Sequence, residues 1–244
     1  MTTVVNMTRN PGRVDLRGRR NFRIAAAGAV LIAALSLWPA RARAWGTDDE
    51  AMAEEIAAML AIKPGDTVAE VGAGHGSMAL RMAKIVGPNG RVYATEIDPD
   101  RLNEIRKRVQ EEGLDNVTVV EATPTDSGLP AGCCDGAYMI GVYHHVTDPA
   151  ATDASIFRAL KPGARLLVND FPPTLWLALF KVEGVPANRG GHGVADRIVV
   201  DEMTKAGFHE LQETAPWHPG FFIRNNYAIV FAKPDGAATA SSPR

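Results

Sequence analysis

Three glycines stand at alternate positions in the stretch VAEVGAGHGS, directly after an apolar run. They are Gly72, Gly74 and Gly76, and Glu70 lies just ahead of them. Each glycine weakens a regular element by about 0.5–1 kcal/mol relative to alanine, so this cluster favours a backbone that must come close to a ligand. The spacing is not the dinucleotide fingerprint, because Ser77 stands where its third glycine would fall. The Glu70 carboxylate would repel a pyrophosphate and suits a cationic ligand instead.

A second carboxylate, Glu96, follows twenty residues after Gly76, at the end of the next apolar run. A carboxylate at this place can accept hydrogen bonds from both ribose hydroxyls of a nucleoside. A nucleoside that is positively charged, lacks phosphates and lies along a glycine loop points to S-adenosyl-L-methionine. Its amino acid end and sulfonium would lie over the loop, and its ribose would pair with Glu96.

A pair of histidines, His144 and His145, follows a later apolar run and supplies the candidate catalytic groups. Ligands of parallel sheets bind outside the carboxyl ends of the strands, which would bring both histidines and Tyr143 near the methyl group. Methyl transfer mainly needs alignment and exclusion of water, and a base matters only when the acceptor must lose a proton. Either histidine is a candidate base; the alternative is an orienting or helix-capping role. Asp170 is a further catalytic candidate, expected to face the acceptor.

The two cysteines, Cys133 and Cys134, are neighbours in the sequence. A bridge between adjacent residues is strained, so we predict no disulfide framework and expect a pair of small residues at a strand entrance. Cys134 and His144 lie on one strand, about 33 Å apart if it is extended, and therefore at its opposite ends. Metal binding by both is rejected, and no metal site is predicted.

The elements that must position these residues alternate between strand and helix. This alternation, with nearly continuous apolar strands, predicts an α/β fold with a doubly wound, mostly parallel, seven-stranded Rossmann-like sheet. Two late strands, near residues 209–217 and 225–233, are expected to form an antiparallel C-terminal edge. The other predicted strands cover residues 67–71, 91–96, 117–121, 136–141 and 165–170, and the predicted helices cover 47–60, 77–86, 99–112, 151–160 and 195–208.

Three stretches make the chain resemble the class I S-adenosylmethionine-dependent methyltransferases. EVGAGHG is similar to the first motif of that superfamily, ATEID to its acidic second-strand end, and LKPGARLLVNDF to its fifth strand with the preceding turn. The likeness covers roughly residues 50–233. Within it, LPAGCCDGAYMIGVYHHVTDP resembles a group of predicted bacterial methyltransferases with N-terminal export signals.

The chain departs from this superfamily at the end of the third strand. An Asp there usually binds the adenine amino group, whereas this chain has Glu121 and, slightly later, Asp126. Asp126 is the candidate for that contact, with a turn or helix-cap role as the alternative. The candidate cofactor-binding residues are therefore Glu70, Gly72, Ala73, Gly74, Gly76, Glu96, Ile97, Asp126 and Tyr143.

The function that the resemblance implies is methyl transfer from S-adenosyl-L-methionine to a small-molecule acceptor. Phe171, Trp176 and Phe180 are candidates to line an apolar acceptor pocket or form a lid, and Arg189 with His192 to bind an acidic group. Two alternatives stay open: a protein carboxyl methyltransferase, because GRVYATEIDPDRLNEIRKRVQEEGLDNVTVV resembles the isoaspartate repair enzymes, and a non-catalytic S-adenosylmethionine- or nucleoside-binding protein. A net charge of −2 offers no basic field for nucleic acid, which is not expected as a partner.

The first 44 residues have the pattern of an export signal. Six arginines between residues 9 and 23 precede an uncharged apolar run, and A-R-A at 42–44 fits a signal-peptidase site. Arg19 and Arg20 fit a twin-arginine signal, and a Sec signal or an uncleaved anchor are the alternatives. We expect an exported, periplasmic or membrane-anchored protein that meets a membrane only through this segment if it stays uncleaved. Residues 45–233 then form the methyltransferase domain, and 234–244 a disordered tail.

Overall fold

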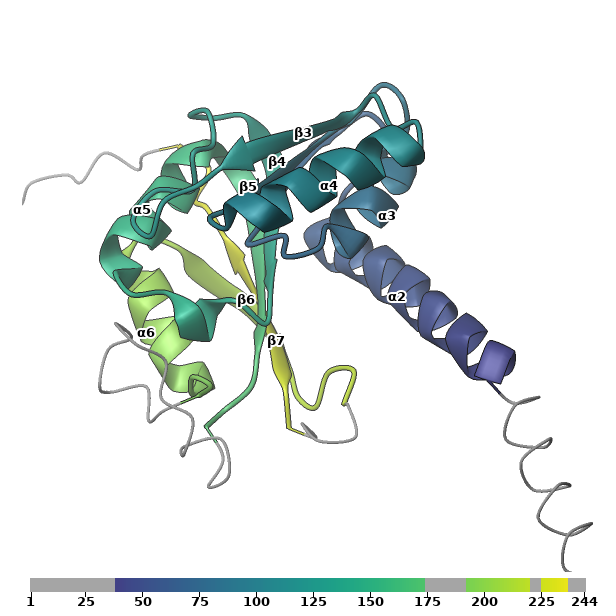
Figure 1. Cartoon of the computed structure of the whole chain (residues 1–244). Coiled ribbons are helices and arrows are strands. Elements are labelled where there is room, and N and C mark those ends of the chain that lie inside the picture. The colour runs from purple at the N-terminus through teal and green to yellow at the C-terminus, as the bar shows by residue number, and fades with distance from the viewer. Residues whose placement is uncertain (1–37, 174–191, 220–224, 237–244) are drawn as a thin grey trace, which may run out of the picture. The chain divides into compact units, whose positions relative to one another are not determined.

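The computed structural model describes residues 38–173, 192–219 and 225–236 (Figure 1). The chain divides into two compact units, Met1–Asp48 and Asp49–Arg244, and the whole sheet belongs to the second. Most of the predicted export signal and most of the predicted tail lie outside the described residues, as do Trp176, Phe180 and Arg189.

The second unit is built on one seven-stranded sheet with the order β3-β2-β1-β4-β5-β7-β6. Strands β1 to β5 run parallel, and β7 pairs antiparallel with both β5 and β6. This confirms the predicted fold class and places β7 inside the sheet, with β6 as the outer strand. The strands are β1 (Thr67–Val71), β2 (Arg91–Glu96), β3 (Val117–Glu121), β4 (Cys134–Ile140), β5 (Leu160–Asp170), β6 (His209–Thr214) and β7 (Tyr227–Ala232).

The helices begin where the sequence supplies capping groups. Asp98 accepts hydrogen bonds from the amides of Asp100 and Arg101, and a proline follows it at the first helical position. Asp148 caps the next helix in the same way through the amide of Ala151. The helices are α2 (Trp38–Leu60), α3 (Ser77–Val86), α4 (Pro99–Glu111), the short 3-10 helix η1 (Tyr143–His145), α5 (Pro149–Ala159) and α6 (Asp196–Lys205).

Helix α2 starts at Trp38, earlier than the predicted residue 47. The prediction began the helix at a capping residue, whereas the apolar and arginine-containing segment before it also takes helical backbone. Within the described residues, no helix combines the length and the apolar character needed to cross a membrane.

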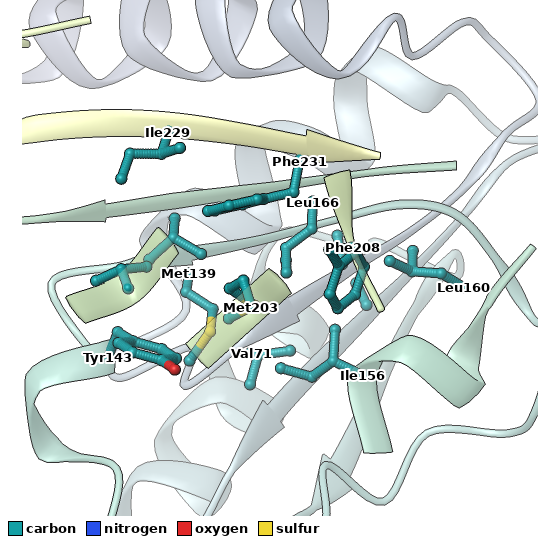
Figure 2. Close-up of a cluster of buried hydrophobic side chains, with 14 of the residues drawn as sticks. Val71, Met139, Tyr143, Ile156, Leu160, Leu166, Met203, Phe208, Ile229 and Phe231 are labelled. Carbon is teal, nitrogen blue, oxygen red and sulfur yellow. The ribbon is translucent and has the colours of Figure 1, made fainter. Parts of the chain in front are cut away.

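The core consists of two buried clusters on opposite faces of the sheet, because successive side chains of a strand point to opposite faces. On β4, Ala137 and Met139 join one cluster, whereas Tyr138 joins the other. The first cluster packs with α5 and α6 (Figure 2), and the second with α3, α4 and the end of α2. The sheet is therefore covered on both faces, which leaves the carboxyl ends of β1 to β5 as the edge where a site can form.

Cys133 and Cys134 are joined by a disulfide at the entrance of β4. The prediction of no disulfide, which rested on the strain of a bridge between adjacent residues, is wrong on this point. The pairing of β4 with β5 is irregular here, with a register shift between Cys134 and Gly136.

Candidate functional site

The glycine loop, residues 72–76 between β1 and α3, has the backbone that its composition predicts. Gly72, Gly74 and Gly76 have φ values of 76°, 54° and 77°, a region that other residues rarely adopt. The amides of Gly72 and Ala73 both donate to the carbonyl of Thr95, at 3.0 and 2.8 Å. The loop is thereby held against the end of β2.

The three glycines differ in what surrounds them. A Cβ at Gly72 would lie 2.6 Å from a methyl carbon of Val142, and one at Gly76 would lie 3.0 Å from Ile105. A Cβ at Gly74 would meet no atom within 4 Å. Packing therefore explains two of the glycines, whereas Gly74 borders open space where a ligand can approach the backbone.

Glu96 is buried at the end of β2 and bound to the glycine loop. Its Oε2 accepts a 2.8 Å hydrogen bond from the Gly74 amide, and its Oε1 accepts from the amides of Ile97 and Asp98 at 2.8 and 3.1 Å. A carboxylate offers about four acceptor positions, so Oε2 keeps one for a further donor such as a ribose hydroxyl. The Ile97 side chain beside it is 56% exposed and is therefore accessible to a ligand at this edge of the sheet.

Glu70 is buried on β1, where the Tyr138 hydroxyl donates to its Oε2 at 3.3 Å. Burial raises the pKa of Glu70 to about 8; hydrogen bonds from Tyr138 and the Ala79 amide lower it, and the charge of Glu96 raises it further. At neutral pH the Glu70 carboxyl is therefore mostly protonated in the ligand-free protein. The sequence predicts a carboxylate that attracts a cation, and a cationic ligand would favour that charged form.

Asp126 lies after β3 and is half-exposed. Its Oδ1 accepts from the Gly128 amide at 2.9 Å, and its Oδ2 forms an ion pair with Arg158, also at 2.9 Å. These partners correspond to the turn role that the sequence left open. The structure therefore favours a turn and an ion pair over the predicted adenine contact.

Tyr143 lies in η1 and is fully buried in the cluster that contains Met139 and Met203 (Figure 2). Its hydroxyl oxygen is 2.8 Å from Oδ2 of Asp153 on α5 and 2.9 Å from Oε2 of Glu202 on α6. Burial, followed by the charges of the two carboxylates, raises the pKa of Tyr143. The side chain packs towards the two helices, and the predicted cofactor contact of Tyr143 stays a prediction.

Asp170, at the end of β5, holds His144 in place. Its Oδ1 lies 2.8 Å from Nδ1 of His144 and accepts from the Phe171 amide, while its Oδ2 accepts from the His144 amide at 2.9 Å. Both side chains are almost completely buried. Both oxygens of Asp170 are engaged with the backbone and with His144, and its expected role at the acceptor stays a prediction.

His145 and His192 lie beside His144, with ring centroids 4.0 and 4.7 Å from its own. Burial and the neighbouring histidines lower the pKa of His145, and burial with His144 lowers the pKa of His192; Asp170 opposes both effects. We call these three residues the histidine cluster. Phe171 stacks on His192, with centroids 5.7 Å apart.

Sequence reasoning considered His192 only as a partner for an acidic group. The signal that could have placed it with the other two is the GGHG stretch, because glycines on both sides of a histidine allow a close approach to the end of a strand.

Comparisons with known proteins agree with this geometry. Residues 68–163 match a family model described as a methyltransferase domain. The ubiquinone/menaquinone biosynthesis C-methyltransferase UbiE of Vibrio vulnificus is 33% identical over 121 residues, which cover 49% of this chain and 46% of that protein. The chain therefore matches less than half of the length of this curated relative.

The fold is shared with solved structures, including the following two. A S-adenosylmethionine-dependent methyltransferase from Aquifex aeolicus superposes with a TM-score of 0.61 at 22% identity, covering 74% of this chain and 89% of the other. A geranyl diphosphate methyltransferase in complex with S-adenosylmethionine gives a TM-score of 0.60 at 16% identity, covering 75% and 85%.

Proposed function

We propose that this chain, which carries a class I S-adenosylmethionine-dependent methyltransferase domain, transfers a methyl group from that donor to a small acceptor. The observation that carries the proposal is the contact between Glu96 and Gly74, which joins the acidic end of β2 to the glycine loop. The loop leaves open space at Gly74, and the Glu96 carboxylate keeps an acceptor position beside it. These features fit a nucleoside with a cationic amino acid end.

The residues that would hold the donor lie at the carboxyl ends of β1 and β2. Glu96 would accept a ribose hydroxyl, the exposed Ile97 side chain would contact the adenine, and the glycine loop would lie along the amino acid end. Glu70 would stabilise positive charge once it is ionised. S-adenosylmethionine supplies a methyl group on a sulfonium, which is already a good leaving group.

The acceptor end of the site is the histidine cluster with Phe171. The ring centroids of His145, His192 and Phe171 lie 4.0, 4.7 and 4.8 Å from that of His144, and such a group of rings suits a flat aromatic molecule. Nδ1 of His144 is engaged by Asp170, so its Nε2 is the nitrogen available to a hydroxyl of the acceptor or to an ion. We propose a hydroxylated aromatic compound as the acceptor class, which is also consistent with the quinone-pathway relative.

The test is calorimetric titration of the purified full chain with S-adenosylmethionine. We expect micromolar binding that falls at least tenfold in Glu96→Gln, because the new amide group cannot accept hydrogen bonds at both positions. Glu111→Gln, at an exposed position of α4, is the matched control and should bind like the wild type.

Transfer itself is measured with donor labelled on the methyl group, offered to hydroxylated aromatic compounds, to aliphatic alcohols and to peptides containing isoaspartate. Label on the aromatic compounds supports the proposal, and label on the peptides would favour the protein carboxyl methyltransferase instead. A folded wild-type chain that binds no donor would refute the proposed function. Donor binding without transfer to any acceptor would favour the non-catalytic binding protein.

A further inference from the structure

The histidine cluster brings three imidazoles to one place at the carboxyl edge of the sheet. One ring nitrogen from each of His144, His145 and His192 lies within 4.8 Å of the other two. We propose that this cluster binds a divalent transition-metal ion, of which Zn²⁺ is the natural candidate, and that Asp170 is its positioning residue.

The state of His144 is the strongest support for an ion. Its side chain is 3% exposed, and its Nε2 has no hydrogen-bond partner within the described part of the chain. A buried polar atom without a partner costs about 1–3 kcal/mol, so a native protein usually satisfies it. A metal ion bound to Nε2 would do so.

Asp170 completes an arrangement that is common around metal-bound histidines. A ligating imidazole usually donates its second N–H to a carboxylate, which fixes the tautomer and raises the basicity of the ligating nitrogen. Here Oδ1 of Asp170 lies 2.8 Å from Nδ1 of His144, and the carboxylate is anchored by the amides of His144 and Phe171. The same carboxylate provides negative charge close to the proposed cation.

The backbone beside His192 is fixed against the end of β5. The Val194 amide donates to the Phe171 carbonyl at 2.9 Å, and the Tyr227 hydroxyl donates to the Val194 carbonyl at 2.9 Å. Gly193 has a φ of 107°, and a Cβ there would lie 2.8 Å from the Phe171 carbonyl oxygen. The backbone that follows His192 is therefore held in a defined conformation, which keeps His192 beside the other two histidines.

The chemistry of the ligands favours zinc or a related ion. Three imidazoles without thiolate suit Zn²⁺, Ni²⁺ and Cu²⁺, and three-histidine zinc sites keep a fourth position open. Zinc–nitrogen bonds of about 2.0–2.1 Å place tetrahedral ligands about 3.3 Å apart, so the imidazoles need to close by up to about 1.5 Å. His145 is exposed and His192 is partly exposed, which leaves both side chains free to turn inward. General-base catalysis would need only one of these three histidines, whereas a metal site uses all of them.

The open position would bind an oxygen of the acceptor and lower the pKa of its hydroxyl, which would replace a protein base. This role rests on the proposed function, whereas the metal site itself does not.

The experiment uses the full chain purified without a histidine tag, stripped with a chelator and dialysed against Zn²⁺. Metal content is measured by mass spectrometry, and Co²⁺ replaces Zn²⁺ to report the geometry through its visible absorption. We expect one ion per chain and a tetrahedral Co²⁺ spectrum. His145→Ala and His192→Ala should each weaken binding at least tenfold, whereas His209→Ala, at an exposed position of β6, should not. The absence of bound metal, or equal affinity in all three variants, would overturn the proposal.

His144 is buried, and its replacement can unfold the protein, so Asp170→Asn tests this part of the site. An amide cannot accept at every position that the carboxylate occupies, and we expect affinity for Zn²⁺ to fall about 10–100-fold. The melting temperature of the metal-free variant separates this effect from simple destabilisation. Unchanged affinity in a folded variant would refute the positioning role of Asp170.

Glu96→Gln distinguishes the two proposals, because it should lose donor binding and retain zinc. If the wild-type chain binds zinc but does not bind S-adenosylmethionine, the metal site is supported and the proposed function is refuted. The reverse result would refute the metal site alone.

Discussion

Glu70 is an acid that the fold keeps away from water, only four positions before Gly74. With a pKa of about 8, it stays protonated in the folded chain at a pH where the unfolded chain has already lost the proton. Well below pH 4.5 both states are protonated, and the ionisation of Glu70 makes no contribution to the free energy of unfolding. As the pH rises towards 8, ionisation stabilises the unfolded state and the free energy of unfolding decreases.

Glu70→Gln should therefore stabilise the ligand-free protein, and the gain should grow with pH. We expect it to increase by about 1.4 kcal/mol per pH unit between pH 4.5 and 8, and to level off above that range. Urea unfolding at pH 5.5 and 7.5 measures the difference. Glu54→Gln, exposed on α2, is the control and should show no such trend. An equal effect of Glu70→Gln at both pH values would contradict a raised pKa.

The same residue bears on donor binding. A cationic ligand beside Glu70 would favour the ionised carboxylate, so the wild type should release protons when it binds S-adenosylmethionine. The binding enthalpy would then depend on the ionisation enthalpy of the buffer, and Glu70→Gln would weaken that dependence.

At the scale of the element, the glycine loop meets two requirements that the sequence alone does not separate: close packing at Gly72 and open space at Gly74. Gly72 is confined by Val142 and by its positive φ, whereas Gly74 is constrained only by its backbone. Alanine at a left-handed position costs about 1–2 kcal/mol, and an unrelieved clash adds to that cost.

Gly72→Ala should therefore lower the free energy of unfolding more than Gly74→Ala, by at least about 1 kcal/mol. Gly74→Ala should instead weaken donor binding beyond its effect on stability, because its methyl group would project into the open space. Urea unfolding and calorimetric titration of both variants test this contrast. Equal loss of stability, with donor binding intact in Gly74→Ala, would count against a ligand at Gly74.

The bounds of strands and helices could be predicted from the sequence more closely than the directions of side chains. Strands β1, β2 and β3 and helix α3 have the predicted bounds, because apolar runs and turn residues mark their ends. Strand β5 starts at Leu160, five residues before the predicted residue 165, because the irregular pairing with β4 extends it. The local sequence pattern does not indicate such an irregularity in strand pairing.

The directions of the Tyr143 and Asp170 side chains could not be predicted from the sequence, because they depend on distant partners. Tyr143 faces Asp153 and Glu202, and Asp170 faces His144. No spacing rule links these positions, so the sequence could place them at the correct edge of the sheet but could not orient them. The placement of His192 beside His144 and His145 was missed for the same reason.

At the scale of the whole molecule, the covered sheet explains why the site lies where it does. Both faces carry helices, so the carboxyl ends of the parallel strands provide the accessible edge, and Glu96, the glycine loop and the histidine cluster all lie there. This general location followed from the alternation of strand and helix alone.

We also propose that residues 1–44 direct export of the protein through a twin-arginine route. Replacing both Arg19 and Arg20 by Lys should prevent export, because the arginine pair is what the export receptor reads. Cell fractionation followed by immunoblotting measures the outcome. Replacing Arg9 and Arg13 by Lys is the control and should leave export unchanged; equal export of both variants would exclude this route.

The position of β7 has a consequence for how the chain is made. Strand β5 ends at Asp170, but the strand that completes its hydrogen bonds begins only at Tyr227. During synthesis, β1 to β5 can assemble while one side of β5 still offers unpaired backbone groups and apolar side chains to other nascent chains. The ribosome adds 56 residues between Asp170 and Tyr227 before β7 can begin to close that side, so an aggregation-prone edge stays open during this part of synthesis.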